Sequence, residues 1–207
     1  MHRYPDLTIE NCGSGGGRMD YAMLSRLQLQ SMTDQENYVK LPAILVGASA
    51  AVLPEQLAIW SYPLANANAD HASFNMVTAM MCRIHQSGRL DSLSAPVAAQ
   101  VSEGIRIYKE ALRKHIPTAV PFYPLGMPDV TDSESPIALG MRSPDQILIG
   151  VWGIDGAASI TVHAPIQNPK LLYPADLGIR VDSVDRGFRV NFPRTHMACL
   201  VTPHPRM

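Results

Sequence analysis

The sequence predicts an α/β region followed by an all-β region, and three observations support this division. Residues 9–38 follow the order strand, glycine-rich turn, helix, strand, which is typical of a parallel strand pair. Two helical patterns follow between residues 72 and 112. From Ile116 onward, prolines and turn residues separate short alternating runs of strand character. We therefore expect an α/β region over residues 1–116 and a C-terminal antiparallel β-sandwich over residues 117–207.

The first strand pair is expected to bring three features together. Ile9–Cys12 is an apolar start that ends in the turn CGSGGG, Met19–Leu29 has helical spacing, and Leu29–Met32 resembles a second short strand. Asp34 follows where this second strand stops. Because the carboxyl ends of parallel strands lie at one edge of a sheet, Cys12, the glycines and Asp34 should converge there.

The remaining elements are assigned from periodicity and turn residues. The aliphatic run Leu41–Ser49 favours a buried strand, and Glu55–Pro63 a loop or short helix. Ala72–His85 has a helical stripe that Asp70 or Ser73 could cap, and a longer helix starts at Ser94-Ala95-Pro96. The expected sandwich strands are Ile137–Met141, Gln146–Trp152, Ala158–His163, Gly178–Val181, Gly187–Phe192 and Ala198–Thr202.

Composition argues against several classes of partner. The chain has 207 residues, 17% of them charged, a net charge of −1 and a pI near 6.6. This balance gives no reason to expect nucleic acid or an anionic membrane as a partner, and no apolar run reaches membrane-spanning length. Three cysteines without framework spacing (Cys12, Cys82 and Cys199) predict free thiols, a reducing compartment and a cytoplasmic location.

The glycine-rich turn allows two interpretations from its residues alone. Gly13-Ser14-Gly15 begins a G-x-G-x-x-G pattern of the dinucleotide- or phosphate-binding type, but the third glycine position holds Arg18 and no G-K-[ST] follows. Alternatively the turn is only structural, with Cys12 a small buried residue and Arg18 paired with Asp20. Both interpretations stay open at this point.

One pair of residues has the spacing of half a metal site. Cys82 and His85 lie at i and i+3 of a predicted helix, but the chain has no second pair at ligand spacing. Packing is therefore the preferred role of both residues. We expect no metal and no cofactor.

A longer motif carries a resemblance to a known family. Residues 10–20, ENCGSGGGRMD, resemble the E-x-C-x-S-G-G-G-R-x-D motif of the family 36 glycoside hydrolases, the bacterial and plant-type α-galactosidases. Met23-Leu24 and Thr33-Asp34, with Asp34 twenty-two residues after Cys12, match the next signature of the family. The resemblance implies the C-terminal part of a (β/α)8 barrel over residues 1–116, with strands six to eight and their helices, followed by a sandwich. Leu41–Ser49 would be the eighth strand.

The resemblance also implies a chemistry. The family hydrolyses terminal α-galactosides with retention, through two carboxylates about 5 Å apart. Asp34 occupies the position of the general acid/base, and Cys12 and Gly15 those of residues that line the galactose pocket. The usual motif around the acid is W-x-S-D-x-T-D, and this chain has Ser31, Thr33 and Asn37 at three of its positions.

The family's nucleophile is not expected in this chain. It belongs to a K-x-D-x-N motif on an earlier strand, which no lysine of this chain begins. We expect this chain to be the C-terminal portion of an α-galactosidase and to be inactive alone. Its unpaired strand edge should bind the missing N-terminal half of the enzyme or lead to homo-oligomers. Trp60 and Tyr62 border the sugar site or pack against the barrel. The alternative is a non-catalytic carbohydrate-binding or phosphate-binding α/β protein.

Overall fold

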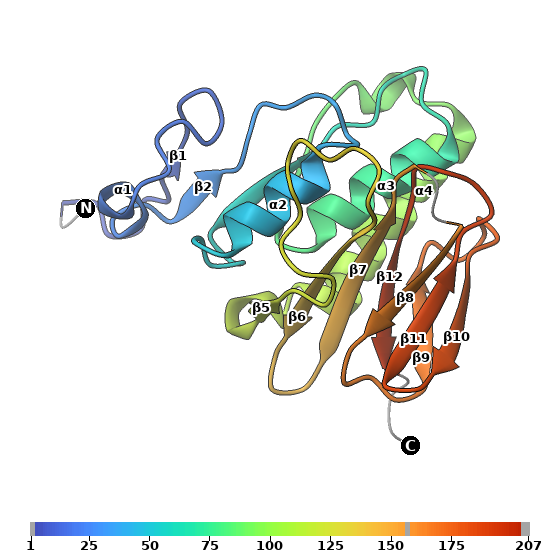
Figure 1. Cartoon of the computed structure of the whole chain (residues 1–207). Coiled ribbons are helices and arrows are strands. Elements are labelled where there is room, and N and C mark those ends of the chain that lie inside the picture. The colour runs from blue at the N-terminus through green and yellow to red at the C-terminus, as the bar shows by residue number, and fades with distance from the viewer. Residues whose placement is uncertain (1–2, 156–157, 204–207) are drawn as a thin grey trace.

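A buried helix, α3 (Ala69–Met80), lies between a parallel sheet and an antiparallel sandwich in the computed structural model, which describes residues 3–155 and 158–203 (Figure 1). Every residue of α3 from 72 to 80 is buried, as expected for a helix that is covered on all sides. Thr78 accepts a hydrogen bond from Trp152 Nε1 at 3.0 Å, on the sandwich side. Met76 Sδ accepts one from Ser61 Oγ on the other.

The N-terminal sheet has four strands that are parallel and lie in sequence order. They are β1 (Glu10–Asn11), β2 (Leu29–Ser31), β3 (Leu57–Ser61) and β4 (Arg83–Gln86). The predicted parallel pairing of the first two strands is therefore confirmed. The α-helices α1 (Tyr21–Leu24), α2 (Leu41–Ser49), α3 and α4 (Ala95–Ile107) connect or follow these strands, with short helical turns at η1 (Leu90–Ser92), η2 (Tyr108–Leu112) and η3 (Ile116–Thr118).

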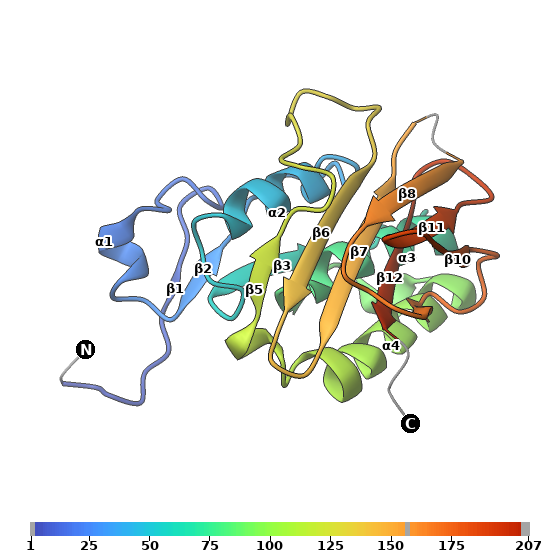
Figure 2. The same ribbon diagram turned by 60° about the horizontal axis from the view of Figure 1, so that its bottom comes forward.

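The sandwich consists of two antiparallel sheets. The strand order of the larger sheet is β5 (Val120–Phe122), β6 (Ile137–Arg142), β7 (Ile147–Gly153), β12 (Met197–Pro203) and β9 (Pro169–Tyr173). The strand order of the smaller sheet is β10 (Arg180–Val184), β11 (Gly187–Asn191) and β8 (Ser159–His163). Side chains such as Val151, Phe188 and Val190 form the core between the two sheets. The opposite face of the larger sheet packs on α3, and Figure 2 shows α1, β1 and β2 on the side of the molecule away from the smaller sheet.

The all-β assignment of the C-terminal half is confirmed, and each of the six expected strands overlaps an observed one. Two strands, β5 and β9, were not predicted. Both contain a proline, which removes a backbone donor and weakens the sequence signal of a strand. Each of them lies at an edge of its sheet, where that missing donor is tolerated.

The prediction of a strand over Leu41–Ser49 is wrong, because this run is the helix α2. A short buried apolar run has the same periodicity in a helix and in a strand. Pro42 in the first turn and the run of leucine and alanine residues favour the helix. Six of its nine residues are buried, so tertiary packing stabilises the helix.

Glu55–Pro63 is not a loop or short helix but contains the strand β3. The helix expected over Ala72–His85 ends at Met80, and its last residues belong to the strand β4. Pairing with β2 and with β4 accounts for the strand conformation of β3. The sequence did not predict this strand, because such pairing is not visible in local periodicity. The N-cap of α3 is Asn68 rather than Asp70 or Ser73.

The helix expected over Met19–Leu29 is reduced to the four residues of α1. None of these residues is buried, and an isolated helix without a packed face is not stable beyond a turn or two. Asp20 caps the helix by accepting a hydrogen bond from Met23 N at 2.9 Å. The expected Arg18–Asp20 pair is not present in the described part of the chain.

The expected barrel strands six to eight need correction in number and position. Four parallel strands are present instead of three, and they form an open sheet, with no closed barrel within residues 3–155 and 158–203. The parallel sheet ends before the antiparallel sheets begin, between β4 and β5, but one hydrophobic cluster joins Phe74, Leu139 and Leu200 across this division. The boundary at residues 116/117 stays a prediction. No helix of the described residues is long and apolar enough to cross a membrane.

Candidate functional site

The glycine bend, residues 12–18, packs its backbone directly on the end of β2. Ser14 and Gly15 have φ values of 50° and 66°, so the chain turns sharply in the left-handed region. A Cβ atom on Gly15 would lie 2.4 Å from the backbone nitrogen of Asp34 and 2.5 Å from Thr33 Cα. The bend and the aspartate therefore lie together, as the parallel strand pair predicted.

Two buried amides fix the bend to the sheet. Asn11 Nδ2 donates to the Arg18 carbonyl oxygen at 2.8 Å and to Gln30 Oε1 at 2.5 Å. Gln30 Nε2 in turn donates to the Ser31 carbonyl oxygen at 2.7 Å. Asn11 and Gln30 are 4% and 0% exposed, so these bonds are protected from water. The network holds the two ends of the bend in register with the ends of β1 and β2.

Asp34 lies in the loop of residues 32–40, which we call the Asp34 loop. It is exposed, and no hydrogen bond or ion pair with another described residue involves its carboxylate. Side-chain caps order the loop around it, because Thr33 Oγ1 accepts from Gln35 N at 3.2 Å and Asn37 Oδ1 from Val39 N at 3.1 Å. The carboxylate is thus presented on an ordered loop and is free to contact a ligand.

The three thiols differ sharply in their surroundings, and all three are free. Cys12, at the start of the bend, is exposed, which contradicts the interpretation of this residue as buried packing. Burial raises the pKa of Cys82 and Cys199 far above the usual thiol range, and both side chains have no exposed surface. Cys12 is therefore the cysteine that can meet a ligand.

One face of the parallel sheet carries a layer of polar and aromatic side chains, one from each strand. Trp60 Nε1 donates to Ser31 Oγ at 3.3 Å, and the Trp60 ring meets the His85 ring edge-on with 5.2 Å between centroids. His85 Nδ1 lies 3.7 Å from Glu10 Oε1. This inner layer (Glu10, Ser31, Trp60 and His85) spans all four strands.

The inner layer reveals the curvature of the sheet. Strands β1 and β4 are three strand spacings apart, about 14 Å in a flat sheet. Their Glu10 and His85 side chains nevertheless come within 3.7 Å, so the sheet curls toward this face. Trp60 remains 37% exposed on the concave side, and Tyr62, just beyond the strand, is 42% exposed.

The structure does not assemble the hypothetical metal site. Cys82 precedes β4 and is fully buried, whereas the His85 side chain belongs to the inner layer. Within the residues described, no group of three or more histidine, cysteine or acidic side chains could hold a metal ion.

The bend is also poorly suited to a phosphate group. Gly13 N and Gly17 N donate inside the bend, to the carbonyl oxygens of Gly15 and Gly13 at 3.3 and 3.0 Å. The helix that follows has four residues, and the Asp20 carboxylate occupies its N-terminus. A phosphate loop instead leads into a longer helix with an open N-terminus.

Sequence reasoning missed the inner layer as a unit. Ser31 was considered only as a departure from the family motif, and His85 only as half of a metal site. Their contacts with Trp60 and Glu10 were not expected, because β3 and β4 were not recognised as strands. The available signal was the parity of β3: Ala58 and Trp60 are two residues apart and share a face, and the register pairs them with Arg83 and His85.

The fold resembles those of known enzymes, although the sequence does not. No protein-family model and no curated protein matches the chain. Solved structures do match. The galactosidase domain of the α-galactosidase–sucrose kinase AgaSK is 20% identical with a TM-score of 0.71, and the match covers 97% of this chain and 29% of that chain. A variant of the GH36 α-galactosidase AgaA from Geobacillus stearothermophilus in complex with raffinose is 15% identical with a TM-score of 0.72 and the same two coverages, and the α-galactosidase from Lactobacillus brevis is 14% identical with a TM-score of 0.73 and coverages of 100% and 31%. At these identities the likeness is one of fold, and the chain spans less than a third of the length of these proteins.

Proposed function

We propose that this chain is the C-terminal portion of a retaining α-galactosidase, which carries the general acid/base Asp34 but not the nucleophile. The observation that carries the proposal is the backbone contact of Gly15 with Thr33 and Asp34 at the carboxyl edge of the parallel sheet. This contact joins the two parts of the family motif, the glycine bend and the aspartate. The fold likeness to α-galactosidases supports the same family independently of the motif.

The parallel sheet is proposed to be part of a (β/α)8 barrel. Doubly wound nucleotide-binding sheets contain a point where the strand order reverses. Here the order β1-β2-β3-β4 follows the sequence, and the sheet curls, as in a segment of a barrel. Four barrel strands would leave four to come from elsewhere, and β1 and β4 are the edges that they would pair with.

In the proposed reaction, Asp34 protonates the glycosidic oxygen and later activates water for hydrolysis of the glycosyl-enzyme. Cys12 and the backbone at Gly15 border the galactose. A side chain at position 15 would enter the space that the Asp34 backbone occupies, so glycine lets the bend approach both the loop and the sugar. The attacking carboxylate must come from the absent part of the enzyme.

Trp60 is proposed to replace an aromatic side chain of the family motif. Ser31 stands where the motif W-x-S-D-x-T-D has tryptophan, and the indole of Trp60 reaches across from β3 to hydrogen bond with Ser31. An aromatic ring would thereby be retained on the concave face, although from a neighbouring strand. Its exposed surface suits the apolar C–H face of a sugar.

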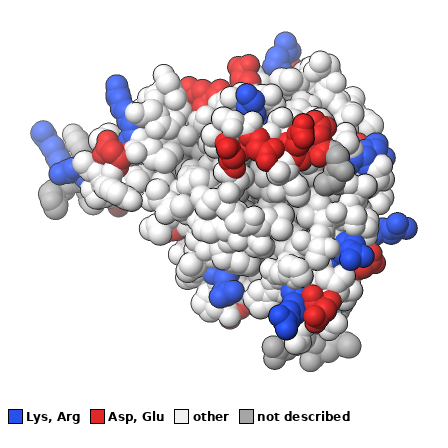
Figure 3. All heavy atoms as spheres, viewed as in Figure 1, with Lys and Arg blue, Asp and Glu red and all other residues white. Residues whose placement is uncertain are grey.

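The surface is consistent with a chain whose parallel sheet has further partners. Figure 3 shows a largely uncharged surface in this view, with acidic side chains over the loop between β5 and β6, which carries Asp129, Asp132 and Glu134. Trp60, Tyr62 and Leu64 are exposed in or just after β3. We propose that the missing N-terminal half of the enzyme covers this side, and that self-association occurs in its absence. A cytoplasmic location stays a prediction.

The test is hydrolysis of an aryl α-galactoside by the chain alone and by an extended polypeptide that supplies a K-x-D-x-N segment in the same reading frame. The chain alone should be inactive, and the extended enzyme active with retention. Asp34→Asn should abolish activity in the extended enzyme without loss of folding, because no described side chain depends on its carboxylate. Galactose binding without turnover in the extended enzyme would favour the non-catalytic carbohydrate-binding alternative.

A further inference from the structure

We propose that the sandwich positions the Asp34 loop through a clamp of four side chains, Arg194, Asp70, His71 and Tyr38. The clamp runs from the loop between β11 and β12, through the first turn of α3, to the segment that carries Asp34. The assignment of Asp34 as acid/base rests on the proposed function, whereas the clamp itself rests on the contacts described below.

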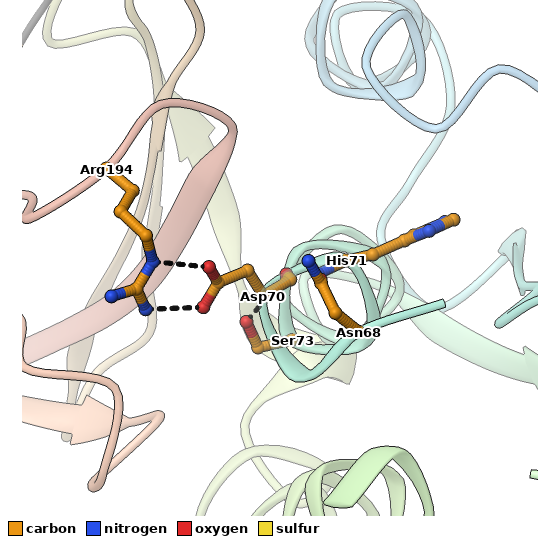
Figure 4. A network of polar contacts seen from close by, with 5 residues as sticks. All are labelled: Asn68, Asp70, His71, Ser73 and Arg194. Carbon is orange, nitrogen blue, oxygen red and sulfur yellow. Dashed lines mark hydrogen bonds and ion pairs between the residues drawn. The ribbon is translucent and has the colours of Figure 1, made fainter. Parts of the chain in front are cut away.

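The sandwich end of the clamp is a two-point ion pair. Arg194 Nε donates to Asp70 Oδ2 at 2.7 Å, and Arg194 Nη2 donates to Asp70 Oδ1 at 2.9 Å (Figure 4). Two parallel bonds between a guanidinium and a carboxylate fix orientation as well as distance. The Asp70 side chain is only 17% exposed, which protects its half of the pair from solvent. Residues 124 positions apart in the sequence are thereby held together.

The first turn of α3 carries this restraint to its other side. Asn68 Oδ1 accepts from His71 N at 2.8 Å, and Ser73 Oγ donates to the Asp70 carbonyl oxygen at 2.9 Å. Both bonds keep the turn wound at its N-terminus. Figure 4 shows Arg194 and His71 on opposite sides of this turn, so the ion pair and the imidazole belong to the same helical turn.

His71 transmits the restraint to the Asp34 loop. Its ring stacks on Tyr38 with 3.9 Å between centroids and 21° between planes, and the Tyr38 ring meets Phe74 edge-on at 5.2 Å. Phe74 has no exposed surface, so Tyr38 is anchored to the core through α3. Burial raises the pKa of Tyr38, and the nearby Asp70 carboxylate raises it further, which keeps the phenol neutral in the stack.

Asp34 is thus held from two directions. The glycine bend bounds the loop at Thr33 and Asp34, and Tyr38 bounds it four residues later. Displacement of a catalytic group by about 1 Å can cost about a hundredfold in rate. A restraint on the far end of this short loop therefore matters for the proposed chemistry, and it would make the sandwich a positioning element for Asp34.

The test is amide hydrogen exchange on the chain as it stands, followed in residues 33–40 and in the core strand β7. Arg194→Gln should raise exchange in residues 33–40 by about fivefold, near the upper end of what a partly exposed ion pair contributes, and leave β7 unchanged. Arg194→Lys should give a smaller rise, since lysine cannot form both bonds. Arg186→Gln is the control, because Arg186 is an exposed sandwich arginine whose side chain, among the described residues, pairs only with its neighbour Asp185.

A double-variant experiment tests whether the effect passes through Asp70. Asp70→Asn should raise the same exchange, and the combination with Arg194→Gln should add little to it. Unchanged exchange in residues 33–40, or an equal rise in β7, would overturn the proposal. Exchange does not depend on hydrolysis, so absence of α-galactosidase activity in the extended enzyme would refute the proposed function while leaving the clamp to be judged by exchange.

Discussion

Substitution of Gly15 by alanine tests the central contact of the site, because two separate effects should add there. Gly15 has φ = 66°, and a residue with a Cβ atom pays about 1–2 kcal/mol in this left-handed conformation. The new atom would also lie 2.4 to 2.5 Å from backbone atoms of Thr33 and Asp34. Ordinary carbon contacts are about 3.5–4.0 Å, so the loop must move by about 1 Å or more.

The expected loss is larger than strain alone. Overpacking against well-packed groups typically costs about 1–3 kcal/mol, and here the neighbours are backbone atoms that cannot rotate away. Gly15→Ala should therefore lower the free energy of unfolding by about 2–5 kcal/mol, the sum of the two effects. Denaturant unfolding followed by circular dichroism measures this difference, with the midpoint shifting at constant slope.

Two other glycines supply matched controls. Gly126 has φ = 82°, and nothing lies within 4 Å of the position that a Cβ atom would take there, so Gly126→Ala should show the strain alone, about 1–2 kcal/mol. Gly47 lies in α2 with open space around it, and Gly47→Ala should stabilise by about 0.5–1 kcal/mol. Equal losses for the substitutions at Gly15 and Gly126 would refute the claimed backbone contact.

Three further outcomes follow from burial and stacking. In a thiol titration of the native protein, Cys12 should react, and Cys82 and Cys199 should stay protected until denaturation, since only Cys12 is exposed. Fast reaction of all three thiols would contradict the core packing. Galactose should change tryptophan emission of the active extended enzyme through the exposed Trp60. Trp60→Phe should reduce the change, because Trp152, the other tryptophan of these 207 residues, is fully buried. An unchanged signal in the variant would place the responding tryptophan elsewhere. Burial lowers the folded-state pKa of His71, so stability present above the unfolded value of about 6.5 should be lost as the pH falls through the lower folded value. His71→Phe keeps a ring on Tyr38 and should flatten that loss, leaving the part due to His115, whose pKa burial also lowers; an unaltered slope would exclude His71 as a source.

The proximity of the glycine bend and Asp34 was more predictable from sequence than the elements around them. The glycine bend and Asp34 belong to one local strand–turn–helix–strand pattern, and the order of parallel strands requires their ends to meet. In contrast, α2 was predicted as a strand, because a short buried apolar run does not distinguish strand from helix. The region of β3 was predicted as a loop or short helix, because its strand conformation depends on pairing with β2 and β4.

Long-range polar contacts were beyond sequence reasoning for a different reason. Arg194 and Asp70 are ordinary surface residues in their local context, and their pairing depends on how the sandwich packs on α3. The Trp60–Ser31 bond likewise requires knowledge of strand register. The local sequence pattern identified the glycine bend and Asp34. The side chains that pair over long distances in the sequence are set by tertiary packing, which the local pattern does not contain.

The stereochemical course of aryl α-galactoside hydrolysis, followed by proton NMR, tests the proposed function more sharply than any other readout when the extended enzyme is compared with its Asp34→Asn variant. We expect that α-galactose appears first with Asp34 present, that the variant is inactive, and that the 207-residue chain alone releases no sugar. Initial release of β-galactose, or full activity without the Asp34 carboxylate, would contradict the assignment.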